Sequence, residues 1–246
     1  MTETPWSPRV CCVIPARYAS TRLPGKPLAE VEGIPLVMWV YRSAVNSEAF
    51  SDVCVATDHR GIARAVRRHG GTAVLTSSTH RSGTERVHEA VADKSCDYVV
   101  NLQGDEPEIP PGLLGDFVAA LADIDDNCLL TCVSNATIEE WKDPHVVKAV
   151  LNARSEALYF SRAPLPYGHG EKGGSVYKHA GIYGFTAEGI RRYCALPGGT
   201  LAEREDLEQL RALEHGMRIK CLLCSYSSRG IDTPGDLEAF RRRARR

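Results

Sequence analysis

The sequence predicts an α/β fold built on a mostly parallel sheet. In the first half of the chain, short apolar runs bounded by turn residues alternate with stretches in which apolar residues recur at helical spacing. The predicted strands are 10–15, 53–57, 72–76, 98–103 and 129–134. The predicted helices are 35–45, 61–69, 83–92 and 111–121. Strands that alternate with helices in this way are typical of parallel sheets with crossover helices.

Beyond about residue 140 the pattern changes. The segments 146–152, 156–166, 177–185 and 218–226 resemble strands, and helices are predicted near 188–196 and 203–215. We expect a smaller mixed α/β subdomain over about 141–214, joined to a core formed by about 10–140 and 215–246. No linker-like segment separates the two parts, so we expect residues 1–246 to form a single domain, in which 169–175 is the best candidate for a mobile loop.

Composition narrows the class of protein. A net charge of −1 predicts no general attraction to nucleic acid, and no run approaches 18 apolar residues, so no membrane partner is expected. The N-terminal ten residues have neither a basic nor an apolar region, so we expect no signal peptide. The nine cysteines lie mostly in apolar runs, which favours structural thiols and a cytoplasmic location. Five arginines among the last six residues predict a solvated helix end, with an acidic partner as the alternative.

The loop after the first predicted strand has the features of an anion site. Arg17, Arg22 and Lys26 lie within ten residues of one another, beside Gly25, a proline and three hydroxyl side chains. In such sheets ligands bind beyond the carboxyl ends of the strands, where cations and free backbone N–H groups meet phosphates. The loop matches neither GxxxxGK[ST] nor GxGxxG, so the phosphate chemistry is of another kind.

Two acidic positions are candidate metal ligands. Asp105 follows the predicted strand 98–103, and an oxygen ligand at a strand end suits Mg²⁺, which also takes substrate phosphate. A turn with a helix cap is an equal alternative there. Asp232 precedes Thr233 and Pro234, where either a helix N-cap or a second metal carboxylate fits the pattern.

Three polar motifs are weak when taken alone. In 82–86 (SGTER), Ser82 or Thr84 is placed to cap a helix, while the alternative is a loop whose backbone recognises a base edge and which Arg86 supports. The segments 178–183 and 208–211 place polar side chains on otherwise apolar stretches. Neither identifies a reaction.

Together, in this order and spacing, the motifs resemble one family, the 3-deoxy-manno-octulosonate (Kdo) cytidylyltransferases. The matching segments are IPARYASTRLPGKPL, VATDH, HRSGTER, VNLQGDEP, VVKAV, ALYFSRAPLP, HAGIYGF, LEQLRAL and GIDTPGDLE, from about residue 10 to 240. The resemblance implies a Rossmann-like, GT-A-type nucleotidyltransferase fold. It also implies transfer of CMP from CTP to a 3-deoxy-2-ulosonic acid, with release of pyrophosphate and with Mg²⁺ as cofactor.

The resemblance assigns roles to residues. Arg17, Lys26, Asp105 and Asp232 would be catalytic, and the two aspartates would bind the metal. The implied nucleotide-binding residues are Pro15, Ala16, Arg17, Arg22, Lys26, Thr57, Ser82, Gly83, Arg86, Gln103 and Asp105. The implied sugar-binding residues are Gln103, Arg162, His179, Tyr183, Glu208 and Gln209. The core would bind the nucleotide, and the subdomain over about 141–214 would bind the sugar and form a homodimer.

The chain departs from the family pattern at Thr186, at His145 and at the pair Glu205-Asp206. All lie in the half expected to face the sugar or a second subunit, so cytidylyl transfer is better supported than Kdo itself. The alternatives are a sialic-acid-like or specialised sugar acid as acceptor and, in a different class, a non-catalytic nucleotide sensor. Retention of Arg17, Lys26, Asp105 and Asp232 together argues against the sensor.

Overall fold

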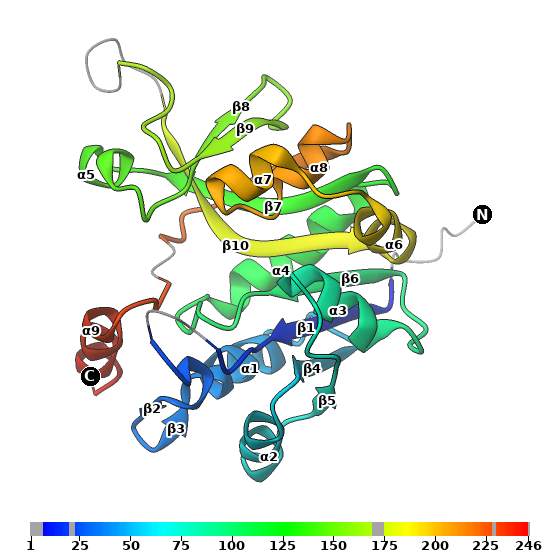
Figure 1. Cartoon of the computed structure of the whole chain (residues 1–246), viewed down its shortest axis with the longest axis vertical. Coiled ribbons are helices and arrows are strands. Elements are labelled where there is room, and N and C mark those ends of the chain that lie inside the picture. The colour runs from blue at the N-terminus through cyan, green and yellow to red at the C-terminus, as the bar shows by residue number, and fades with distance from the viewer. Residues whose placement is uncertain (1–6, 20–22, 169–174, 228–229, 246) are drawn as a thin grey trace.

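One mixed β-sheet forms the centre of the molecule (Figure 1). The structure, a computed structural model, describes residues 7–19, 23–168, 175–227 and 230–245. Within these residues the sheet has nine strands in the order β11-β7-β10-β6-β1-β4-β5, with β8 paired to β10 and β9 paired to β8. Its strands are β1 (Val10–Pro15), β4 (Asp52–Thr57), β5 (Ala73–Leu75), β6 (Tyr98–Leu102), β7 (Cys128–Asn135), β8 (Lys148–Leu151), β9 (Ala157–Ser161), β10 (Tyr177–Thr186) and β11 (Arg218–Leu223). This is the predicted α/β class.

Helices cover both faces of the sheet (Figure 1). One face packs against α1 (Leu36–Asn46), α2 (Arg60–Arg68) and α4 (Pro111–Ala120). The other packs against α3 (Gly83–Val91), α6 (Ala187–Ala195) and α8 (Leu210–Glu214), with α7 (Thr200–Glu205) beside α8. None of the described helices is long and apolar enough to cross a membrane.

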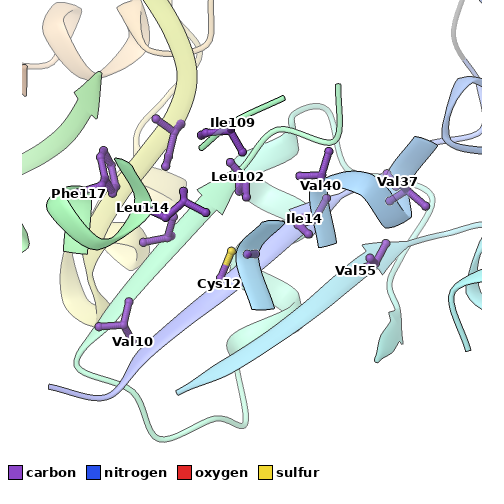
Figure 2. Packing of buried hydrophobic residues seen from close by; sticks show 14 of the residues in the cluster. Val10, Cys12, Ile14, Val37, Val40, Val55, Leu102, Ile109, Leu114 and Phe117 are labelled. Atoms are coloured by element: carbon purple, nitrogen blue, oxygen red, sulfur yellow. The ribbon is translucent and has the colours of Figure 1, made fainter. Parts of the chain in front are cut away.

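Strand β1 shows why the first apolar run is continuous. It pairs in parallel with β4 on one side and β6 on the other. Val10, Cys12 and Ile14 point into the core with α1 and α4, as Figure 2 shows, whereas Cys11 and Val13 point into the opposite core. A strand buried on both faces needs an apolar residue at every position, because successive side chains alternate between the faces.

Strand β10 interrupts the parallel arrangement. It lies between β6 and β7 and runs antiparallel to both, while β11 pairs in parallel with β7. Ile182 pairs with Leu102, the last residue of β6, so residues 177–181 of β10 extend past the carboxyl end of the parallel strands. The start of β10 therefore lies at the edge where ligands bind in such sheets.

The structure corrects two sequence predictions. The helix predicted over 203–215 is two helices, α7 and α8, because Asp206 adopts a left-handed conformation with φ 54° that ends α7. The segment between the predicted strands 129–134 and 146–152, where no helix is predicted, contains α5 (Ile138–Lys142), begun by a capping box between Thr137 and Glu140. The candidate mobile loop, 169–175, lies outside the described residues except for Ser175.

The C-terminal helix α9 (Pro234–Ala244) packs on the N-terminal half of the chain. Leu237 and Phe240 join Val31 and Leu36 in a small third core, next to the hairpin of β2 (Glu30–Val31) and β3 (Ile34–Pro35). The predicted solvated arginine end is confirmed at Arg242 and Arg245, which are exposed, whereas Arg241 and Arg243 are half-buried. Arg241 donates to the carbonyl of Glu30, Arg243 pairs with Glu108, and Arg245 pairs with Glu32. Arg241 and Arg243 join α9 to β2 and to the segment after β6, while the exposed pair of Arg245 contributes little.

Candidate active site

Two adjoining cavities open at the carboxyl edge of the parallel strands. The first has a volume of about 410 Å³ and lies where the loop after β1 meets the start of α3. It is lined by Pro15, Ala16, Arg17, Lys26, Pro27, His80, Arg81, Ser82, Gly83, Arg86, Gln103, Gly104, Asp105, Asp206, Glu208 and Asp232. Segments from five distant parts of the chain therefore contribute to one site.

Lys26 joins the two candidate metal ligands. Its Nζ donates to Asp105 Oδ2 at 2.9 Å and to Asp232 Oδ1 at 3.0 Å. Burial alone would lower the pKa of Lys26, but the two carboxylates outweigh burial and raise it, so the ammonium stays charged. The structure thus brings Asp105 and Asp232 onto one cation, a juxtaposition that spacing along the chain does not indicate.

A second segment of the chain, residues 231–236, brings Asp232 to the site. The backbone N–H of Ile231 donates to the carbonyl of Asp105 at 3.0 Å, and the Ile231 side chain is fully buried in the third core. Thr233 then caps α9, its side chain accepting from the N–H of Asp236. Asp232 is held between a backbone hydrogen bond on one side and a helix start on the other.

The start of α3 forms the opposite wall of the first cavity. Ser82 caps the helix by accepting a hydrogen bond from the N–H of Glu85 at 3.2 Å. The helix cap is one of the two alternatives predicted for this motif. At Gly83, a Cβ would stand 3.4 Å from the Pro15 ring and 3.5 Å from Nε2 of Gln103. The backbone of this helix start therefore lies close to the end of β1.

Arg86 has a supporting position. It is buried, donates to Thr76 Oγ1 at 2.6 Å and pairs with Asp58 at 3.3 Å, which ties α3 to the loops after β4 and β5. Thr57, expected at the nucleotide, is buried at the end of β4 and accepts a hydrogen bond from the N–H of His59. It is not among the residues that line either cavity. Arg22 lies outside the described residues.

The second cavity, of about 640 Å³, lies between the start of β10, α9 and the segment before α8. Its lining includes all six of the sugar-binding residues predicted from the resemblance: Gln103, Arg162, His179, Tyr183, Glu208 and Gln209. It shares Gln103, Asp105, Asp206, Glu208 and Asp232 with the first cavity. Two ligands bound in the two cavities would meet at Asp105 and Asp232.

His179 is neutral, and its tautomer follows from its partner. Thr131 Oγ1 donates to the carbonyl of Ile182 at 2.8 Å, so its proton is used, and it accepts from His179 Nε2 at 2.9 Å. Burial lowers the pKa of His179 to about 3. Nδ1 is left as an acceptor, which suits a ligand hydroxyl better than a ligand carboxylate.

Gln209 has a buried amide with unused capacity. Its Oε1 accepts from the hydroxyl of Tyr183 at 3.0 Å, and its side chain is 2% exposed. Among the described residues its Nε2 has no hydrogen-bond partner. A buried, unsatisfied amide costs about 1–3 kcal/mol, so this group is positioned for an acceptor on a ligand.

Glu208 lies on the wall between the cavities. Its carboxylate accepts from the N–H of Thr84 at 3.3 Å, and its backbone carbonyl accepts from Tyr193. Burial raises the pKa of Glu208 despite the hydrogen bond from Thr84 to its carboxylate. The side chain therefore has a stronger tendency to hold a proton than an exposed glutamate.

Several lining residues were not predicted from the sequence. They include His80, Arg81 and Asp206 in the first cavity, and Glu106, Lys178 and Arg243 in the second. Arg243 belongs to the C-terminal arginine run, and its distance from the other motifs along the chain conceals its place. Lys178 stands in the motif beside His179 and is buried, where it pairs with Glu140.

A divalent cation fits the donor set at the shared wall. Among the described residues no group of three or more His, Cys, Asp or Glu side chains forms a ready site. Asp105 and Asp232 nevertheless point at one cationic group, the ammonium of Lys26. Two carboxylates completed by phosphate oxygens and water are a usual ligand set for Mg²⁺.

Comparisons with known proteins identify the family of the chain. A family model described as cytidylyltransferase matches residues 11–219. The chain is 44% identical to the 3-deoxy-manno-octulosonate cytidylyltransferase of Rhodopseudomonas palustris (strain HaA2), over 96% of this chain and 98% of that one. It is 40% identical to the enzyme of the same name from Bdellovibrio bacteriovorus, over 93% and 95%.

Solved structures give the same result. A CMP:2-keto-3-deoxy-manno-octonic acid synthetase complexed with CTP matches with a TM-score of 0.90 and 37% identity, over 96% of this chain and 98% of that one. A 4-diphosphocytidyl-2C-methyl-D-erythritol synthase from Anaerococcus prevotii, 15% identical with a TM-score of 0.64 over 97% and 99% of the two chains, shares the fold. By sequence along almost its whole length, and by structure, the chain belongs to the 3-deoxy-manno-octulosonate cytidylyltransferase family.

Proposed function

We propose that this chain transfers CMP from CTP to the anomeric hydroxyl of Kdo. The observation that supports this most directly is the wall that the two cavities share, with Asp105 and Asp232 upon it. The anomeric hydroxyl loses its proton to water as its oxygen attacks the α-phosphorus. The bond from that phosphorus to the oxygen bridging it to the β-phosphate breaks, and pyrophosphate leaves. Such transfers need little covalent help from the protein, so positioning and charge neutralisation account for most of the rate.

The first cavity is the proposed CTP site. Arg17 and Lys26 neutralise the triphosphate and the pyrophosphate that leaves. Ser82 and the backbone at Gly83, both of which line this cavity at the start of α3, recognise cytosine. Arg86 acts behind them by fixing α3 to two neighbouring loops.

Mg²⁺ is the proposed cofactor, and Asp105 and Asp232 would hold it. When bound, it lowers the pKa of a hydroxyl and stabilises charge on the phosphate oxygens. Lys26, which pairs with both carboxylates in this structure, would then be available to phosphate oxygens. Chelation with EDTA is expected to stop turnover, and added Mg²⁺ to restore it.

The second cavity is the proposed sugar-acid site. The Gln209 amide donates to a sugar oxygen, and Nδ1 of His179 accepts from a sugar hydroxyl. Arg162 supplies the cation that a sugar carboxylate requires, since guanidinium binds carboxylate in a bidentate manner. Tyr183 fixes Gln209 through its hydroxyl.

A pyrophosphate-release screen tests the proposal. CTP is combined in turn with Kdo, 8-amino-Kdo, sialic acid and related acids, with ATP and UTP in place of CTP as nucleotide controls. Release with CTP and Kdo alone is the expected result. Preference for another acid would move the assignment to a related acceptor, and release with none of the acids would favour the nucleotide sensor.

We further infer a cytoplasmic homodimer. All nine cysteines are free thiols, as in proteins of reducing compartments. Strand β9 pairs only with β8 among the described strands, and its Leu158 is 60% exposed, which suits a contact between subunits. Light scattering is expected to give twice the chain mass of 26.9 kDa.

A further inference from the structure

Lys148 is the most unusual charged residue outside the two cavities. It lies in β8 with 0% exposure, and its Nζ donates to three backbone carbonyls: Asp143 at 2.7 Å, Val146 at 2.6 Å and Arg162 at 2.6 Å. Burial lowers the pKa of Lys148, with nearby Asp143 opposing the shift. Burying an ammonium costs several kcal/mol, so an apolar residue would serve mere packing better.

The three carbonyls belong to two segments that line the second cavity. Residues 143–147 follow α5, and Asp143, His145, Val146 and Val147 all line that cavity. Arg162 follows β9, whose Ser161 pairs with Lys148, and it lines the same cavity. Lys148 lies behind both segments and lines neither cavity. It therefore joins the two parts of the wall without being in reach of a ligand there.

Arg162 is held from the opposite direction by the residues that end α7. Its backbone N–H donates to Glu205 Oε2 at 2.9 Å, and its Nε donates to the carbonyl of Glu205 at 2.9 Å. Its terminal nitrogens donate to the carbonyls of Pro144 and Asp206, each at 3.3 Å. Lys148 fixes the remaining backbone group of Arg162, its carbonyl. The direction of the guanidinium thus depends on Lys148 as well as on Glu205.

We propose that Lys148 is a positioning residue for the acceptor sugar acid: by gathering the carbonyls of Asp143, Val146 and Arg162, it sets the guanidinium of Arg162 at the sugar carboxylate. This rests on the proposed function, in which Arg162 binds that carboxylate. Lys148 lines neither cavity, and the three residues whose carbonyls it binds line the second cavity and not the first. It therefore acts on binding of the acid and not on binding of CTP or on the transfer itself.

The test compares Lys148→Met with Lys220→Met in steady-state pyrophosphate release, with CTP and Kdo varied in turn. Methionine keeps the length of lysine but removes the three donors. Lys220 is the matched control, because its Nζ donates to one backbone carbonyl, that of Arg154, away from both cavities. Lys148→Met is expected to raise KM for Kdo about tenfold or more, with kcat and KM for CTP within about twofold of wild type. Lys148→Gln, which keeps two donors, is expected to fall between Lys148→Met and wild type.

A residue that only stabilises the fold would give a different result. Its loss would lower Tm and the active fraction, and so kcat, while both KM values in the folded protein stayed unchanged. That outcome, or an equal rise in both KM values, overturns the proposal. If Lys148→Met does not fold, Glu205→Gln is measured instead. This variant weakens the hydrogen bond from the Arg162 N–H to the Glu205 carboxylate. An unchanged KM for Kdo in Glu205→Gln overturns the proposal too. A wild-type protein that releases no pyrophosphate with Kdo would instead refute the proposed function.

Discussion

Replacing Gly181 by alanine tests whether the position of Gln103 matters to both substrates. Gly181 lies in the irregular part of β10, and a Cβ there would stand 2.9 Å from Cγ and 3.2 Å from Cβ of Gln103. Ordinary contact begins at 3.4 Å, so Gln103 must retreat by about half an ångström. These atoms are at the base of the side chain, and the Gln103 N–H is bonded to the carbonyl of Gly181 at 3.1 Å. Rotation of the amide alone cannot relieve the contact.

The expected cost follows from that displacement. Overpacking of this kind destabilises a protein by about 1–3 kcal/mol, and for a chain of this size each kcal/mol lowers Tm by about 2–4 °C. Displacing a group shared by both cavities is expected to lower kcat/KM for CTP and for Kdo about tenfold to a hundredfold. Pyrophosphate release and thermal melting measure the two effects separately.

Two glycines provide controls. At Gly184, in the same strand, a Cβ would press on Leu121 and Phe117 in the core, so Gly184→Ala is expected to lower Tm and leave kcat/KM unchanged. At Gly115 in α4 nothing lies within 4 Å, so Gly115→Ala is expected to change neither activity nor, beyond a small gain, stability. If Gly181→Ala keeps kcat/KM for both substrates within about twofold of wild type, the reasoning about Gln103 is refuted.

Three further predictions concern single groups. Asp105→Ala is expected to lower kcat about a thousandfold while circular dichroism stays unchanged, and near-wild-type pyrophosphate release would contradict the metal assignment. Glu208→Gln is expected to raise Tm at pH 8 but not near pH 4. Burial raises the pKa of Glu208, so the protonated side chain stabilises the fold at low pH, and this stability is lost as the pH rises and the carboxylate ionises. An equal difference in Tm between the variant and the wild type at both pH values would contradict this. His179, with its pKa lowered to about 3, is expected to show only the neutral Nε2–H tautomer by ¹⁵N NMR from pH 5 to 8, and an imidazolium signal at pH 6 would oppose that.

The parallel strands were predictable because their physical signal is local. β1 is predicted with the bounds that it has, since both of its faces are buried and every position is apolar. The break between α7 and α8 was not predictable, because Asp206 adopts φ 54° without a glycine to mark it. The signal for α5 was present in Thr137 and Glu140, but a helix of five residues that buries none of them has no apolar period.

The candidate site residues were predicted mainly through the resemblance. The sequence alone does not show which residues far apart in the chain meet in space. Residue types at strand ends indicated Lys26 and Asp105, whereas only the packing of α9 brings Asp232 to them. Thr57 is buried at the end of β4 and lines neither cavity, so its contact with the nucleotide stays a prediction. Arg243 shows the converse case, a run of charges that looks like surface and contains one cavity residue.

Because the site depends on α9, it is completed only at a late stage of synthesis of the chain. Lys26 and Asp105 are made before Asp232, which is far from both of them along the chain. Until residue 232 and the start of α9 have been made and have packed in the third core, the shared wall lacks one of the three charges that meet there. A product ended by a premature stop codon before residue 232 would lack that carboxylate. The charged centre is thus assembled later than the nine strands of the sheet, all of which precede residue 232.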